Sequence, residues 1–356
     1  MQKRRAIMRK FDYSFLDNGM LPADLINITG GIYSLKTSSG LRKSEFVTVF
    51  TELESIAKIQ SVKSSNAIEG IVTSDKRITE IVNQSSAPKN HNEEEIVGYR
   101  DALNEIHNGY DHISFNEGNI LRLHEIMMSV SGDDLAGKYK VTDNVIVEVD
   151  SSGNRRVRFR PISAAETPSA MEQLELAYLD ACSNSNINQL LLIPCVILDF
   201  LCIHPFRDGN GRMSRLLSLL LLYQNGFDVG KFISFEAQIN KYKDFYYNAL
   251  QQSSVGWHTN TNDYFPFIKN FLSTLYMCYK ELDKRFAVVR SKRITKSARI
   301  EATVLDSLIP ISKAEICEIL PDISPTTIEA VLGKMVKDGQ IERIGVSKGT
   351  KYIKKS

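Results

Sequence analysis

The sequence predicts a mainly α-helical protein with one β-hairpin and a small second unit at the C-terminal end. Apolar residues recur every three or four positions across residues 46–59 and 120–127, the pattern of a buried helix face. A continuous apolar run at 190–203 precedes a second amphipathic stretch at 213–221. Because the chain has 356 residues, we expect two or more domains with separate cores.

We expect four parts along the chain. They are an N-terminal helical region (1–110) with one notable helix at about 43–70, a central helical core (111–283), a basic helical connector (284–299) and a C-terminal unit (300–356). Gly70 is the expected end of the notable helix, because glycine readily adopts the left-handed conformation that closes helices.

The one hairpin is expected within residues 137–161. Val145–Val149 and Val157–Phe159 are short β-branched or alternating runs, and Asp150–Asn154 between them is rich in turn-forming residues. Arginines at 155, 156, 158 and 160 make this segment basic. By itself the pattern would indicate an exposed basic hairpin.

The most apolar segment, 190–203, is shorter than the roughly 20 residues that a membrane span needs, and it contains Pro194 and Asp199. We therefore expect a buried central helix and no membrane association. The five cysteines include no C-x-x-C pair, and the basic N-terminus precedes no long apolar segment. These features predict a cytoplasmic protein, and the net charge of +2 gives no reason to expect nucleic acid as a partner.

Residues 204–215, HPFRDGNGRMSR, combine the side chains that a phosphate-ester site needs. His204 can accept a proton near neutral pH, and Asp208 can hold a hard cation such as Mg²⁺. The string lies between two apolar runs. It therefore predicts a helix, an anion-binding loop and a second helix.

The loop itself favours anion binding. Gly209 and Gly211, around Asn210, allow close approach of the backbone, so that several N–H groups can point at one anion. The following helix adds the positive end of its dipole. Arg212 and Arg215 are three residues apart and share one helix face.

The string resembles the signature of the Fic family, H-P-F-x-(D/E)-G-N-G-R-x-x-R, and all its specified positions are met. The resemblance implies a Fic-type helical bundle in which the hairpin, called the flap, holds a target protein as an added strand. It also implies transfer of AMP from ATP, with Mg²⁺, to a Ser, Thr or Tyr hydroxyl. Glycine at position 211 favours this mode, since the kinase-like branch of the family has lysine there.

The same resemblance assigns roles to individual residues. His204 would be the general base and Asp208 the Mg²⁺ ligand. Asn210 and the backbone of Gly209 and Gly211 would cradle phosphate, and Arg212 and Arg215 would hold the β- and γ-phosphates.

Ser65, Glu69 and Gly70 resemble the family's inhibitory motif, (S/T)-x-x-x-E-(G/N). The resemblance implies that Glu69 pairs with Arg215 and takes the place of the γ-phosphate, so that inhibition is built into this chain. It predicts that Glu69 lies within hydrogen-bond reach of Arg215 when no ATP is bound. A second option stays open, in which Glu69 orients a water molecule and the site removes AMP from a modified protein.

Three further side chains have two interpretations each. Tyr246 and Tyr247 match a pattern associated with the family, and they either line the adenine pocket or belong to the core. His124 lies at helical spacing, and we expect a core or capping histidine rather than a catalytic one.

The C-terminal unit resembles a winged helix-turn-helix, with helices at 312–320 and 324–337 and a two-stranded wing. The second helix begins with Thr326 and Thr327 and has no early arginine, so we rank protein contact, including homodimerisation or target docking, ahead of DNA binding. A DNA-binding regulator with a nucleotide-sensing site is the competing function. The intact base His204 favours the enzyme.

Overall fold

A computed structural model describes residues 9–83, 86–149, 155–290, 295–305, 307, 310–320, 323–345 and 350–355. The predicted turn Asp150–Asn154 and parts of 300–356 lie outside these residues. The helices of the larger body are α1 (Phe15–Asn18), α2 (Ala23–Glu45), α3 (Val47–Ile68), α4 (Asp75–Val82), α5 (His91–Gly109), α6 (Glu117–Met128), α7 (Thr167–Ser183), α8 (Gln189–Ile203), α9 (Asn210–Gln224), α10 (Phe235–Lys241), α11 (Lys243–Ser254) and α12 (Phe265–Arg290). The prediction of a mainly helical protein is confirmed.

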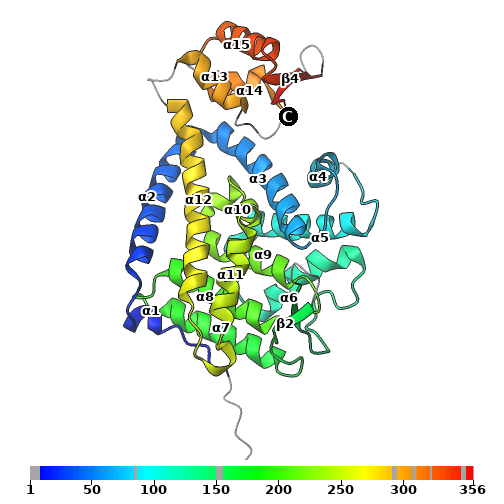
Figure 1. Cartoon of the computed structure of the whole chain (residues 1–356), viewed down its shortest axis with the longest axis vertical. Coiled ribbons are helices and arrows are strands. Elements are labelled where there is room, and N and C mark those ends of the chain that lie inside the picture. Colours follow the sequence, from blue (N-terminus) through cyan, green and yellow to red (C-terminus); the bar gives the residue numbers. More distant parts are fainter. Residues whose placement is uncertain are drawn as a thin grey trace, which may run out of the picture.

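Helix α8 lies in the lower part of the larger body, next to α7, in the view of Figure 1. It starts at the N-cap Asn188, whose side chain accepts a hydrogen bond from the Leu190 N–H at 2.9 Å. Every residue from Leu190 to Ile203 is buried, and α7, α9, α11 and α12 pack around the helix. The apolar run is therefore core, as predicted. In the described ranges no helix has the length and apolar character needed to cross a membrane.

A buried polar cluster fixes α8 to the N-terminal segment. Asp199 accepts hydrogen bonds from Arg9 at 2.9 Å, Tyr13 at 2.8 Å and the Trp257 indole at 2.6 Å. Burial raises the pKa of Asp199, and the charge of Arg9 opposes that shift. Because a buried carboxylate needs its partners, this cluster holds α8 in one position and with it the residue at its end, His204.

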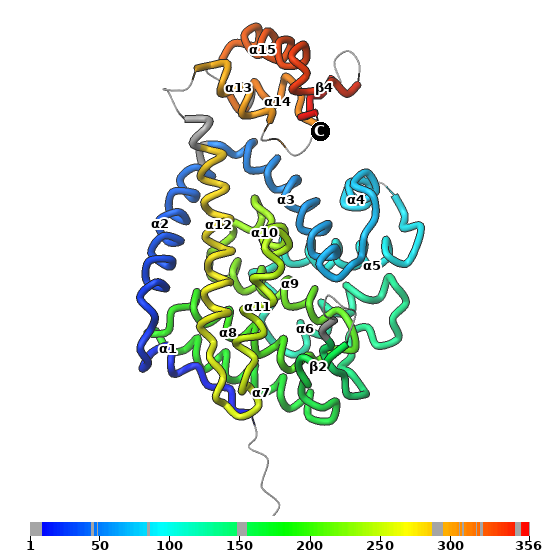
Figure 2. The backbone as a smooth tube through the Cα atoms, in the orientation of Figure 1, coloured from blue at the N-terminus to red at the C-terminus, as the bar shows by residue number. Residues whose placement is uncertain are grey.

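Helix α3 begins at the top of the larger body, below the C-terminal unit, and runs downward into the body (Figure 2). Helices α2 and α12 lie side by side, and the chain reverses at Phe46 between α2 and α3. Phe46 and Phe50 pack on Phe286 of α12, with ring centroids 5.7 Å and 5.2 Å away. The helix expected at about 43–70 is thus shorter, because residues 43–45 belong to α2.

The predicted hairpin is present as strands β1 (Ile146–Val149) and β2 (Arg155–Phe159), which pair antiparallel with Val147 opposite Val157. Its base is held at β2, where Phe159 stacks on His258 at 5.3 Å.

The C-terminal unit contains α13 (Lys296–Leu305), α14 (Lys313–Ile319), α15 (Pro325–Lys337) and the antiparallel strands β3 (Ile311–Ser312), β4 (Ile341–Ile344) and β5 (Lys351–Lys354). It has a core of its own, which includes Ile300 and Leu332. Strand β3 was not predicted, because two residues are too short to show alternation. The expected connector at 284–299 is also different: 284–290 continue α12, and 296–299 open α13. The winged-helix interpretation stays a prediction.

Candidate functional site

The site lies where α8 ends and α9 begins. His204 closes α8 in the left-handed conformation, with φ 53° and ψ 61°, while its N–H still donates to the Phe200 carbonyl at 2.9 Å. A non-glycine residue in this region costs about 1–3 kcal/mol and persists only where its surroundings enforce it. The chain turns at this residue and, after a short loop, begins α9 at Asn210.

Hydrogen bonding fixes which nitrogen of His204 carries the proton. Nδ1 lies 3.3 Å from the Leu201 carbonyl oxygen. Because a carbonyl can only accept, Nδ1 must be the protonated nitrogen, which leaves Nε2 as a lone-pair acceptor. Burial lowers the pKa of His204 to about 4, so the ring is neutral at pH 7. Such a nitrogen can take a proton from a hydroxyl group.

The loop after His204 is braced by a lysine that the sequence analysis missed. Lys140 is buried, and its ammonium donates to the carbonyls of Ile203 at 3.1 Å and His204 at 2.9 Å. Its own N–H donates to the Pro205 carbonyl at 2.9 Å. Burial lowers the pKa of Lys140 to about 8. No motif marked this residue, since it lies more than 60 positions upstream of the loop.

Asn210 supports the loop from inside. Its side-chain oxygen accepts from the Phe206 N–H at 2.9 Å, and its amide donates to the Phe206 carbonyl at 2.8 Å. The amide nitrogen keeps a second N–H and the oxygen a second lone pair, so the expected role of this side chain in cradling phosphate stays a prediction.

His124 has the structural place that the sequence analysis favoured. Its Nδ1 accepts from the Gly137 N–H at 3.0 Å, so Nε2 carries the proton and donates to the Asp208 carbonyl at 3.2 Å. Its ring stacks on Phe206 with centroids 3.7 Å apart. Burial lowers the pKa of His124 to about 4. The side chain holds the loop and is neutral at pH 7.

The start of α9 forms a site suited to phosphate. Gly209 is left-handed, with φ 79°, and the first N–H groups of α9 have no intrahelical acceptor. Arg212 is 1% exposed, and its Nη2 lies 2.7 Å from Glu95 Oε2 of α5. Its Nε and Nη1 are buried and have no hydrogen-bond partner among the residues that the structure describes. These donors are free to bind an anion.

Asp208 lies at the exposed edge of the loop. Its side chain is 67% exposed, and one oxygen accepts from the Gly209 N–H at 2.7 Å. Within the described parts of the chain, no three metal-ligating side chains gather at one point. A single open carboxylate fits Mg²⁺, which commonly combines one or two protein carboxylates with phosphate oxygens and water.

Arg215 is held by the motif at the end of α3. Its Nη2 donates to Glu69 Oε1 at 2.9 Å and to the Ser65 carbonyl at 2.9 Å, and its Nε donates to Ser65 Oγ at 2.8 Å. The predicted contact between Glu69 and Arg215 is confirmed. A Cβ at Gly211 would lie 2.3 Å from Glu69 Oε1, so a glycine at this position leaves room for the carboxylate.

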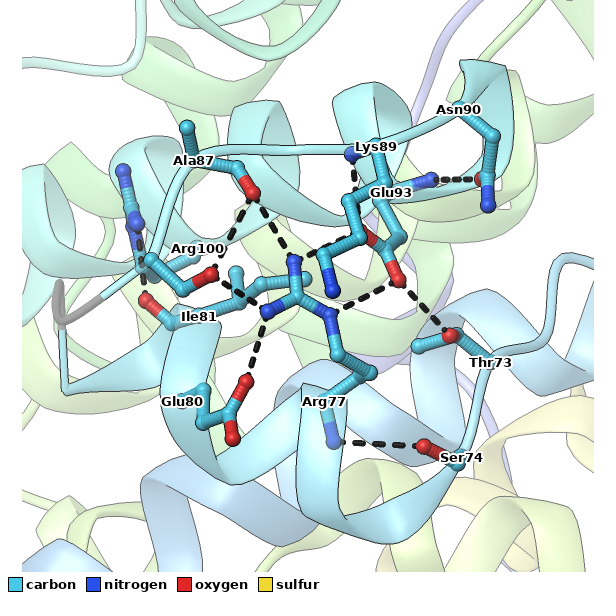
Figure 3. Close-up of polar contacts among 11 residues, drawn as sticks. Thr73, Ser74, Arg77, Glu80, Ile81, Ala87, Lys89, Asn90, Glu93 and Arg100 are labelled. Carbon is cyan, nitrogen blue, oxygen red and sulfur yellow. Dashed lines mark hydrogen bonds and ion pairs between the residues drawn. The ribbon is translucent and has the colours of Figure 1, made fainter.

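The chain on both sides of Glu69 is anchored. The ammonium of Lys243 donates to the Ile68 carbonyl at 2.7 Å, and Gly70 has φ 82°. Beyond it, Arg77 of α4 binds Glu93 of α5 through two hydrogen bonds of 3.1 Å and 2.7 Å (Figure 3). Glu93 also accepts from Thr73 at 3.0 Å. The segment after the motif is thereby tied to α5.

The two tyrosines of α11 have different places. Tyr246 is buried in the core, with its ring 5.7 Å from that of Phe267. Tyr247 is half-buried, and its ring lies 5.9 Å from the guanidinium carbon of Arg158 on β2. Tyr246 thus has the core position, whereas Tyr247 lies between α11 and the flap.

Residues 114–222 match the model of the Fic/DOC family. A Fido domain-containing protein of Dictyostelium discoideum is 32% identical over 87 residues, which are 24% of this chain and 59% of that protein. The chain thus spans about three fifths of the length of this curated relative.

Solved structures share the fold. A Fic family protein from Desulfovibrio desulfuricans G20 superposes with a TM-score of 0.63 at 20% identity, over 94% of this chain and 97% of that one. Fic-1 from C. elegans gives a TM-score of 0.54 at 18% identity, over 74% of each chain. Residues 114–222 therefore match the Fic/DOC family model, and the chain shares the helical fold of these solved Fic proteins.

Proposed function

We propose that this protein transfers AMP from ATP to a Ser, Thr or Tyr hydroxyl of a target protein, and that Glu69 holds it in an inhibited state. One observation carries the proposal. His204, whose Nε2 is proton-free, ends α8 directly before the loop that opens α9 with Arg212 and Arg215, and Glu69 engages Arg215.

The reaction needs little covalent chemistry from the protein. The target hydroxyl oxygen attacks the α-phosphorus, the bond from that phosphorus to the β-phosphate bridging oxygen breaks, and pyrophosphate leaves. His204 Nε2 receives the hydroxyl proton. Arg212, Arg215 and the first N–H groups of α9 stabilise the charge on the departing phosphates. Lys140 and Asn210 keep these groups in place through their loop contacts.

Asp208 is the residue that would hold Mg²⁺ beside the phosphates, since its carboxylate is open to solvent. The ion, when bound, neutralises part of the triphosphate charge.

Inhibition follows from competition for Arg215. The guanidinium is 2% exposed and already donates to one Glu69 oxygen and to both Ser65 oxygens. A triphosphate that needs the same guanidinium must displace Glu69 first. Burial makes the exchange demanding, because Arg215 cannot be left without an acceptor.

The flap is the proposed target-binding element. Val147 and Val157 form a cross-strand pair, and both are exposed on the hairpin. An exposed apolar pair on a two-stranded sheet suits an added strand from a target, which would gain main-chain hydrogen bonds. For the C-terminal unit we propose protein contact rather than DNA binding, since Glu329 near the start of α15 presents an acidic group paired with Lys313 at 2.8 Å.

The test uses two labels. Glu69→Gly protein is incubated with cell lysate and ATP labelled either at the α-phosphate or at the γ-phosphate. Transfer of AMP places the α-label and not the γ-label on protein, and Glu69→Gly/His204→Ala should place neither.

The opposite pattern, with γ-label on protein, would indicate phosphate transfer and contradict the proposal.

The reverse reaction is tested with the same material. Loss of α-label after addition of wild-type protein, but not of His204→Ala protein, would favour the hydrolase alternative in which Glu69 orients water.

A further inference from the structure

We infer that Glu95 of α5 is a positioning residue, which holds Arg212 away from Asp208 and so keeps both residues available to the nucleotide and its metal ion. This inference rests on the proposed function, because it concerns the same phosphate site. Neither the motif nor its resemblance to the family assigns any role to Glu95.

Arg212 lies between two carboxylates. Its Nη2 is 2.7 Å from Glu95 Oε2 and 3.5 Å from Asp208 Oδ2. The shorter contact is to the more buried acid, since the Glu95 side chain is 10% exposed and that of Asp208 is 67% exposed. A charge pair at the shorter distance with less solvent is the stronger of the two.

Glu95 is held in place by the packing of its helix. Gly98 follows one turn later on the same face of α5, and a Cβ there would lie 1.9 Å from the Met127 carbonyl oxygen of α6. This close approach of α5 and α6 leaves Glu95 little freedom. Two residues before it, Glu93 is fixed by Arg77, as Figure 3 shows.

This geometry leaves two donors of Arg212 and the carboxylate of Asp208 available for ligands. Arg212 turns Nη2 to Glu95 as a charge contact, whereas its buried Nε and Nη1 have no hydrogen-bond partner in the described parts of the chain. Without the Glu95 charge, the nearest acid for this buried guanidinium is Asp208, because a buried arginine seeks a counter-ion. Closure of the 3.5 Å gap would then occupy the Asp208 carboxylate and turn Arg212 away from phosphate.

A double-mutant cycle in the Glu69→Gly background tests this inference. ATP binding is measured by calorimetry without divalent metal for the parent, Glu95→Gln, Asp208→Ala and the combined variant. We expect Glu95→Gln to weaken ATP binding about fivefold where Asp208 is present. We expect the same change to have little effect where Asp208 is alanine, because the competing acid is gone.

The control is Glu94→Gln, which removes a neighbouring carboxylate that contacts His91 at 3.4 Å instead of Arg212. Glu95→Asp keeps the charge and serves as a second variant if the glutamine variant unfolds, with a smaller expected loss. Equal weakening in both Asp208 backgrounds would mean a merely structural role and overturn the inference. Tighter or unchanged ATP binding in Glu95→Gln would overturn it too.

AMP transfer is measured in a separate experiment from ATP binding. In the same background, Glu95→Gln should raise the Mg²⁺ concentration for half-maximal AMP transfer severalfold, whereas Glu94→Gln should not. A Glu69→Gly parent that binds ATP but transfers no AMP would contradict the proposed function and leave the binding cycle interpretable.

Discussion

Each of the two arginines of α9 pairs most closely with one carboxylate, and the two pairs differ in how firmly that carboxylate is held. Arg215 and Arg212 are both almost fully buried, with acid contacts of 2.9 Å and 2.7 Å. Glu69 caps the C-terminal end of α3, is 32% exposed and precedes the left-handed Gly70. Glu95 lies inside α5 and is 10% exposed.

The difference indicates which pair can open. A carboxylate at a helix end, beside a glycine, can turn away when a few backbone angles change. One in the first half of a 19-residue helix packed against α6 cannot move without the helix. We therefore propose that the Glu69 pair is the switch and the Glu95 pair is scaffold.

The largest expected effect comes from a residue outside both pairs. In Glu69→Gly protein, His204→Ala should lower the rate of AMP transfer about 10³-fold, because the hydroxyl loses its proton acceptor. ATP affinity, measured by calorimetry, should stay within about twofold of the parent's affinity, since the arginines and not His204 bind the phosphates. A parallel loss of ATP binding would assign His204 to the anion site instead.

A middle-sized effect is expected at Ser65. Ser65→Ala removes the acceptor for Arg215 Nε at 2.8 Å and should raise AMP transfer by the otherwise wild-type protein about fivefold. The rise should be smaller than that of Glu69→Gly, because the Glu69 contact remains. Ser64→Ala, at the adjacent position of α3, is the matched control. If Ser65→Ala lowered the rate, Ser65 would be a support for Arg215 rather than part of the switch.

Lys243 should have a smaller effect. Its ammonium caps the Ile68 carbonyl at 2.7 Å, so Lys243→Met should loosen the last turn of α3 and raise the rate about twofold. Lys241→Met, on the adjacent helix, should leave the rate of labelled AMP transfer unchanged. If the two variants changed the rate equally, the contact between Lys243 and the end of α3 would have no part in the switch.

The smallest change is expected with pH. Burial lowers the pKa of His204 to about 4, so the neutral form that can accept a proton persists as pH falls and is lost only near that value. In Glu69→Gly protein, kcat should vary by less than about twofold between pH 5.5 and 8, whereas a histidine with the usual pKa of about 6.5 would be only about one tenth neutral at pH 5.5. A tenfold fall in this range would mean that His204 is more solvated than its surroundings indicate.

Much of the fold and of the site could be predicted because single segments carry the signal. The string 204–215 holds its own helix, loop and helix, and the apolar run before it can only be core. The Glu69 contact was predictable through the motif that Ser65 and Glu69 share.

Glu95 and Lys140 could not be predicted in the same way. Each is a single side chain brought to the loop by packing of α5 or by the segment before the flap, and neither stands in a recognisable pattern. The structural role of Asn210 was missed for a related reason. Its type and position suit phosphate, but only the three-dimensional turn shows that its side chain also bonds the Phe206 backbone at both polar ends.

The central claim is that Glu69 and ATP compete for Arg215. The most direct measurement compares wild-type and Glu69→Gly protein for incorporation of α-labelled AMP into the protein itself at saturating ATP and Mg²⁺. We expect the variant to incorporate AMP at least about tenfold faster, since a buried charge pair no longer blocks the phosphate position. Equal rates in the two proteins would contradict the account.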